Sequence, residues 1–175
     1  ARTAHVRQDL LPEGIDPTLE EPSIYQPEIT SGVFSYSTHA AVVSVDPETG
    51  EVVPLHYLAI QDVGFALNPM LIEGQIHGGV VQGLGWGMRE GMEFDEQGLL
   101  LNPSFMDYAL FRADEIPPVD IELIEKPSPH GPFGIRGVGE PPIVPGAAAL
   151  ASALQNTVGI RFCDCLLYTS DAADE

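Results

Sequence analysis

The segment from Pro69 to about Met88 constrains the fold most strongly, because it combines helix signals with six glycines. Asn68 is a suitable N-cap and Pro69 suits the first helical position, so the sequence predicts a helix here. Each glycine inside a helix costs roughly 0.5–1 kcal/mol relative to alanine, so six cost about 3–6 kcal/mol. That cost is comparable to the net stability of a marginal domain, so another part of the structure must require the bare backbone.

The two flanks of this predicted helix differ in chemistry. One flank is aliphatic and is expected to pack on a sheet. It consists of Ile72, Ile76, Val80 and Leu84. The other face carries two amides, three glycines and an indole, namely Gln75, Gly78, Gly79, Gln82, Gly83 and Trp86. Such a face suits either a bulky, planar, polar ligand or tight packing against another element, and spacing alone favours packing. His77 has no partner at metal-ligand spacing and is expected to be structural.

The remaining pattern predicts an α+β fold with a mixed or antiparallel sheet. Residues 39–45 and 51–63 are rich in β-branched side chains and flank the turn sequence 46–50, which indicates a hairpin. A second hairpin is expected around residues 95–98, and a further strand over 120–126. A second helix is expected from near Pro142 to about Val158, with Gly159 as its stop.

A glycine- and proline-rich stretch from Gly134 to Gly146 contains Glu140. The residue before a proline is excluded from the helical region, so Pro141 leaves Glu140 little backbone freedom. The positive end of the second helix, together with Arg136, would favour an ionised carboxylate. An ionised carboxylate in a defined place suits a general base, although an acid that only complements a helix end is the commoner case.

The charge balance excludes several partners. Seven Lys+Arg against 26 Asp+Glu give a formal net charge of −19, which disfavours nucleic acid and anionic membrane surfaces. The apolar runs are too short and too interrupted for a membrane span. The only cysteines, Cys163 and Cys165, are poorly placed for a disulfide and lack companions for a zinc site. The composition fits a reducing compartment, and a cytoplasmic location is expected.

Three segments are expected along the chain. Residues 1–29 are rich in proline and acids and are expected to form an extended arm that begins at a cut rather than at a natural start. Residues 30–164 should form one domain, or most of one. Residues 165–175 resemble one reading frame of a common sequencing adapter and are expected to be a non-native tail without packing.

Two of these motifs together resemble the molybdenum-binding subunit of the xanthine dehydrogenase and aldehyde oxidase family, in its C-terminal part. Residues 68–85 are similar to the helix that these molybdenum hydroxylases lay against their pterin cofactor. Residues 137–142 are similar to the loop that carries their catalytic glutamate. The turn at 46–50 and the runs 104–108 and 127–130 match the same family in the same order.

The resemblance implies roles for particular residues. Glu140 corresponds to the general base that takes a proton from the attacking oxygen. Gln75 corresponds to a glutamine that hydrogen-bonds the cofactor, and further cofactor contacts are implied along the same surface. These are Gly78, Gly79, Gln82, Gly83 and Gly139. No protein side chain is implied as a metal ligand, because the pterin holds the molybdenum.

The resemblance also implies cofactors, a reaction and partners. Molybdenum–molybdopterin, with the cytosine dinucleotide form as an option, would hydroxylate an electrophilic carbon of an N-heterocycle or aldehyde with oxygen from water. Iron–sulfur clusters and FAD are expected on partner subunits or domains. Upstream segments of the same subunit, which carry the rest of the cofactor cradle and the specificity residues, are absent here. The chain alone is therefore expected to be inactive. The alternatives are a catalytically idle binding or assembly module of the same fold and, more weakly, an unrelated ligand-binding β-rich domain.

Overall fold

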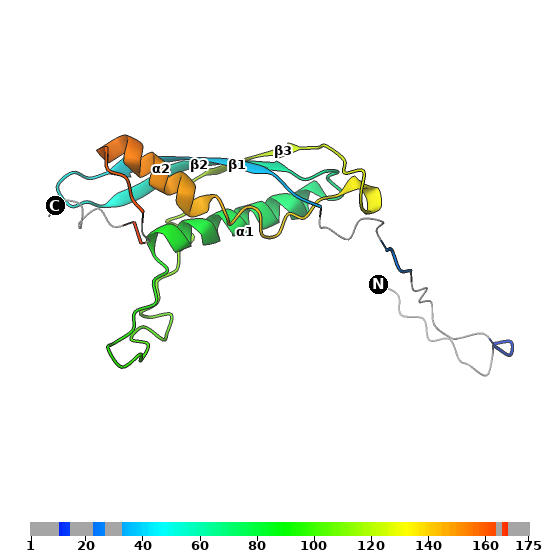
Figure 1. Ribbon diagram of the computed structural model, residues 1–175, viewed down its shortest axis with the longest axis horizontal. Coiled ribbons are helices and arrows are strands. Elements are labelled where there is room, and N and C mark those ends of the chain that lie inside the picture. The colour runs from blue at the N-terminus through cyan, green and yellow to red at the C-terminus, as the bar shows by residue number, and fades with distance from the viewer. Residues whose placement is uncertain (1–10, 15–22, 27–32, 164–165, 168–175) are drawn as a thin grey trace.

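The computed structural model describes residues 11–14, 23–26, 33–163 and 166–167 and shows two layers. A three-stranded sheet forms one layer, and the two helices α1 and α2 lie together on one side of it (Figure 1). The predicted α+β architecture is confirmed. Most of the predicted arm over residues 1–29 lies outside the described residues, which include only 11–14 and 23–26 of it.

The sheet has the order β1-β2-β3. β1 (Ser37–Val45) and β2 (Val52–Asp62) form the predicted antiparallel hairpin, with a register irregularity between Val42 and Val43. β3 (Val119–Ile124) pairs with β2 in parallel, so a long crossover that includes α1 separates these two neighbouring strands. Parallel neighbours require such a crossover, and here it places α1 across the sheet.

α1 (Pro69–Met88) has the predicted bounds. The Asn68 side chain accepts a hydrogen bond from the N–H of Leu71 at 3.3 Å, and Pro69 occupies the first turn. α2 (Gly146–Val158) ends at Gly159, which has a φ of 77°, as the glycine stop predicts. It begins four residues later than predicted, because residues 141–145 form successive turns.

The core lies between the helices and the inner face of the sheet. The aliphatic flank of α1 is buried as predicted and meets Tyr57 and Ala59 of β2 and Leu150 and Leu154 of α2. Burying a large aliphatic side chain contributes roughly 1.5–3 kcal/mol, so this flank supplies much of the driving force that keeps α1 on the sheet.

The segment that follows α1 projects away from both layers (Figure 1). This segment contains the second predicted hairpin, where Phe94 and Leu100 form one antiparallel bridge. The Asp95 carboxylate accepts hydrogen bonds from the N–H groups of Gln97 and Leu99 and so closes the turn. The turn is confirmed, although it joins a single bridge rather than two full strands.

The segment after Asp164 was expected to lack packing, and this expectation is wrong at Leu167. The Leu167 side chain is 6% exposed and belongs to the core, and its N–H donates to the Gly87 carbonyl at 2.8 Å. Residues 168–175 lie outside the described part of the chain, so the adapter origin of this segment stays a prediction. Cys163 is exposed, whereas Cys165 is not described.

The imidazole of His39 makes stability dependent on pH. Its Nδ1 lies 2.8 Å from the Tyr57 hydroxyl, and burial lowers the pKa of His39 from 6.5 to about 4. The unfolded chain therefore binds more protons than the folded chain between these two values. This contribution to stability is present above pH 6.5 and is lost as the pH falls towards 4.

We therefore expect His39→Gln to flatten the pH dependence of stability in this window. Urea midpoints measured at steps from pH 7 to pH 4.5 should fall more steeply for the wild-type chain than for the variant. His56→Gln is the matched control, because His56 is a more exposed histidine paired with Asp120 on the opposite face of the sheet. Equal slopes for the wild-type chain and His39→Gln would contradict the prediction.

Candidate functional site

The loop that carries Glu140 is held against the ends of β2 and β3. The N–H of Ser128 donates to the Gly134 carbonyl at 2.9 Å, and the N–H of Arg136 donates to the Val63 carbonyl at 3.0 Å. Gly64 has a φ of +72°, and a β-carbon there would lie 2.2 Å from the Gly134 oxygen. Only glycine permits this close approach of the two backbones, so the loop begins from a fixed point.

Glu140 itself lies on an exposed turn. Its carbonyl accepts a hydrogen bond from the N–H of Ile143 at 3.0 Å, and the Ile143 carbonyl in turn accepts from Gly146. Among the described residues, no hydrogen bond or ion pair involves the Glu140 carboxylate. The side chain is therefore carried on a constrained backbone but is free to act on a group from outside this part of the chain.

Two expectations about Glu140 are corrected by the structure. The carboxylate does not sit at the mouth of α2, because that helix begins six residues later, at Gly146. Arg136 does not pair with Glu140 either. Its Nε lies 3.4 Å from Asp62 Oδ2, and its Nη1 donates to the Phe34 carbonyl.

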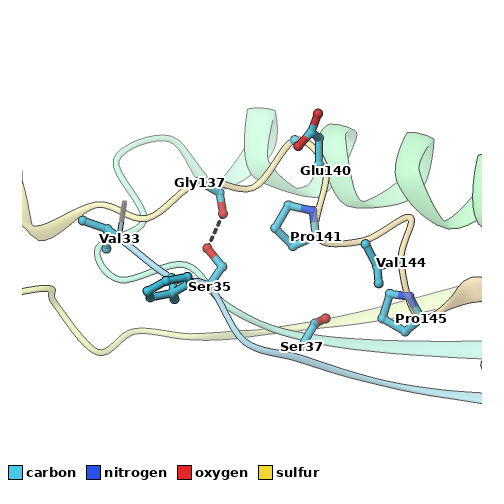
Figure 2. Close-up of a pocket in the computed structure, with 10 residues that line it drawn as sticks. Val33, Ser35, Ser37, Gly137, Glu140, Pro141, Val144 and Pro145 are labelled. Atoms are coloured by element: carbon cyan, nitrogen blue, oxygen red, sulfur yellow. Dashed lines mark hydrogen bonds between the residues drawn. The ribbon is translucent and has the colours of Figure 1, made fainter. Parts of the chain in front are cut away.

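An open groove of about 760 Å³ runs beside Glu140. Its walls are the segment 33–37, which leads into β1, and parts of the loop 137–145. The Ser35 hydroxyl donates to the Gly137 carbonyl at 2.5 Å across the groove. Figure 2 shows the Glu140 carboxylate at the rim, pointing away from Ser35 and Ser37. The carboxylate is thus accessible from the α1 side of the loop.

The neighbouring face of α1 is bare and polar. Gln75, Gly78 and Gln82 are exposed, and nothing lies within 4 Å of the position that a β-carbon would take at Gly78. At Gly139 the nearest atom to such a β-carbon is the Gln75 side-chain nitrogen, at 3.7 Å. The structure therefore brings Gln75 of α1 beside Gly139, the residue that precedes Glu140, although the two are 64 positions apart in sequence.

Gly79 and Gly83 lie in a different environment from Gly78. Both are buried, and a β-carbon would lie 2.7 Å from Pro142 Cβ at Gly79 and 2.6 Å from the Ile143 oxygen at Gly83. These two glycines let the loop and the start of α2 pack directly on α1. Tight packing, which spacing alone favoured, accounts for the lack of side chains at these two glycines, and the cofactor contacts that the resemblance implies there stay a prediction.

His77 has the structural role that the sequence indicated, whereas Asp62 is a functional candidate that the sequence analysis missed. His77 is exposed, and within the described part of the chain its Nδ1 bonds only to the Glu73 carbonyl, one turn earlier in α1, at 2.9 Å. Asp62 was not singled out. It is 8% exposed and pairs with Arg136, and the sequence signal was an acid at the end of a strand that is mostly apolar. Such a buried charge needs a partner, which could have pointed to Arg136.

Comparison with known families gives one family-model match. Residues 4–117 match the model described as a molybdopterin cofactor-binding domain. That match includes α1 with Gln75 but ends before Glu140.

Curated proteins and solved structures extend the likeness to most of the chain. The chain is 37% identical over 147 residues to the nicotine 6-hydroxylase large subunit of Paenarthrobacter nicotinovorans, covering 84% of this chain and 18% of that protein. It is also 37% identical to the carbon monoxide dehydrogenase large chain of Hydrogenophaga pseudoflava, covering 87% and 19%. Quinoline 2-oxidoreductase from Pseudomonas putida 86 matches with a TM-score of 0.75 and 33% identity, covering 87% of this chain and 20% of that one. The chain thus spans about a fifth of these relatives.

Proposed function

Since the chain belongs to the molybdopterin cofactor-binding domain family of molybdenum hydroxylases, we propose that it forms part of a hydroxylase active site in which Glu140 is the general base. In this proposal a complete subunit hydroxylates an electrophilic carbon of an N-heterocycle or aldehyde. Water supplies the oxygen, and two electrons leave the substrate. The supporting observation is the accessible Glu140 carboxylate, which has no hydrogen-bond or ion-pair partner among the described residues and lies beside the exposed Gln75 face of α1.

The residues present fit a large planar cofactor. Gly74 and Gly78 leave open space above the α1 backbone, and Gln75 and Gln82 border that space with amides that can donate and accept. The cofactor, when bound, would supply the redox chemistry. In the proposal, Gln75, Gly78, Gln82 and Gly139 contact the pterin and fix its orientation, and Glu140 accepts the proton from the attacking oxygen.

The cofactor form and the partners follow from the same proposal. We expect molybdopterin or its cytosine dinucleotide form, and electron transfer to iron–sulfur clusters and FAD on partner subunits. Names such as "large subunit" and "large chain" among the relatives are consistent with assembly from several chains. No helix among the described residues is long and apolar enough to cross a membrane. We expect a cytoplasmic enzyme whose upstream segments complete the site.

The second candidate is an idle binding or assembly module of the same fold. An idle module would not require an accessible carboxylate next to a cofactor-facing amide, and this pairing favours the hydroxylase. Bound molybdenum in the complete subunit, together with substrate-dependent reduction, separates the two candidates. The idle module would show no reduction with carbon monoxide, xanthine, nicotine or quinoline as probe substrates.

Gln75→Leu in the complete subunit should weaken the retention of molybdenum and pterin by about 10- to 150-fold, because a hydrogen bond to a charged group contributes roughly 1.5–3 kcal/mol. Metal analysis and pterin fluorescence after gel filtration measure this retention. Gln97→Leu is the matched control, since Gln97 is an exposed glutamine at the tip of the second hairpin. Equal molybdenum contents in both variants would argue against a cofactor contact at Gln75.

A further inference from the structure

We infer that Arg136 is the positioning residue for Glu140, an inference that rests on the proposed role of Glu140 as general base. Arg136 lies four positions before Glu140, and the intervening residues include Gly137 and Gly139. Glycines give a loop many accessible conformations, so this short segment would not hold a carboxylate in place by itself. Pro141 restricts the backbone directly after Glu140, and Arg136 restricts the loop before Glu140.

Arg136 is tied to the body of the protein in three directions. Its backbone N–H donates to the Val63 carbonyl at 3.0 Å, just beyond β2. Its Nη1 donates to the Phe34 carbonyl, in the segment that leads into β1. Its Nε lies 3.4 Å from Asp62 Oδ2, which is an ion pair outside hydrogen-bond geometry. The Arg136 side chain thus connects the Glu140 loop to the end of β2 and to the segment that precedes β1.

The acceptor of this ion pair is itself fixed. Asp62 Oδ1 accepts the N–H of Gly64 at 3.0 Å, and the backbone N–H of Asp62 donates to the Tyr36 carbonyl at 2.8 Å. The side chains of Arg136 and Asp62 are 16% and 10% exposed, so solvent screens their attraction only weakly. Ser35 adds a further tie through its hydrogen bond to the Gly137 carbonyl.

The alternative is an ion pair that only stabilises the fold. The pair of Arg89 and Glu115 provides a matched comparison, because its nitrogen and oxygen are 2.9 Å apart and its side chains are 34% and 28% exposed. Arg89 is the C-cap of α1, and no hydrogen bond or ion pair among the described residues joins Arg89 or Glu115 to the Glu140 loop or to β2. A structural role for Arg136 would resemble the role of Arg89, whereas a positioning role would act through Glu140.

The test uses the complete subunit assembled with its partners, in a double-mutant cycle that combines Arg136→Met with Glu140→Gln. The limiting rate of enzyme reduction and the KM are measured with the reactive member of a panel of carbon monoxide, xanthine, nicotine and quinoline. Hydrogen exchange of the amides at 137–140 and the molybdenum content are measured on the same samples. Arg89→Met is the control, and Arg136→Lys keeps the positive charge for the case in which Arg136→Met does not fold.

Arg136→Met should lower the limiting rate about 100-fold with little change in KM or molybdenum content, since small misplacements of a catalytic group cost this much. Exchange at 137–140 should accelerate, and Arg136→Lys should restore part of the rate. In the Glu140→Gln background the Arg136→Met change should alter the rate by less than about twofold, because residues that act as a unit are not additive.

Three results would overturn the inference: an unchanged rate in both Arg136 variants, an equal loss in both backgrounds, or a loss matched by Arg89→Met. If Glu140→Gln keeps its activity while Arg136→Met still accelerates exchange at 137–140, Glu140 is not the general base, but Arg136 still anchors the loop. If Glu140→Gln is inactive and neither Arg136 variant has an effect, Glu140 remains the proposed general base, and Arg136 does not position it.

Discussion

Replacing Glu140 with glutamine in the complete enzyme should leave the fold and the cofactor content unchanged and remove most of the turnover. The substitution keeps the size of the side chain and removes its ability to accept a proton. Loss of a positioned general base typically lowers the rate about 10²–10⁴-fold. The fold should not respond, because no described residue forms a hydrogen bond or ion pair with this carboxylate.

Molybdenum content and the rate of substrate-dependent reduction, measured on the same sample, decide the outcome for Glu140→Gln. Glu96→Gln is the control, because Glu96 is an exposed acid at the tip of the second hairpin, outside the proposed site. Full metal content with a near-wild-type rate in Glu140→Gln would show that this acid has no role as a base.

The elements of the fold followed from local signals in the sequence. The Asn68–Pro69 start, the aliphatic flank of α1 and the turn at 46–50 all predicted structure that formed, with shifts of only one or two residues at the hairpin strands. Each of these signals depends on residues that are close in sequence, so the local structure that it predicts forms in the folded chain. The parallel pairing of β3 with β2 was not predicted, because a six-residue strand has no local pattern that specifies its neighbour.

The surroundings of Glu140 were harder to predict than its backbone. The prolines correctly indicated a constrained turn, yet they also suggested a helix start at Pro142, whereas α2 begins at Gly146. Arg136 was assigned to the nearest acid in sequence, and the fold instead brings it to Asp62, 74 positions away. Such long-range pairing depends on tertiary structure, which spacing within one segment does not report.

The glycines of α1 divide into two kinds that the sequence could not separate. Successive residues of an α-helix differ by about 100° around the helix axis, so Gly78 and Gly79 point in different directions, and the sequence did not indicate which of them another element covers. The structure exposes Gly78 and buries Gly79, because the loop after Glu140 crosses α1 on one side only. The estimated penalty of about 3–6 kcal/mol is therefore offset in part by packing within this chain, without any cofactor.

This division predicts opposite effects for alanine at two positions of α1. Gly83→Ala should destabilise the chain by about 1–3 kcal/mol, because the new methyl group would lie 2.6 Å from the Ile143 oxygen and 3.0 Å from Gly146 Cα. Both neighbours are backbone atoms, so α2 must move away from α1. Gly78→Ala should stabilise the chain by about 0.5–1 kcal/mol, because it meets open space and gains helix propensity.

Urea unfolding of the two variants and the wild-type chain gives both free energies. Gly74→Ala repeats the favourable case at a second open position of α1 and controls for helix propensity. If Gly83→Ala were as stable as Gly78→Ala, the packing account of the buried glycines would fail. In the complete subunit Gly78→Ala has a second expected effect, because a methyl group there would stand on the proposed cofactor surface. A variant that unfolds at higher urea yet retains less molybdenum would show that the exposed glycine is kept for the cofactor and the buried one for packing.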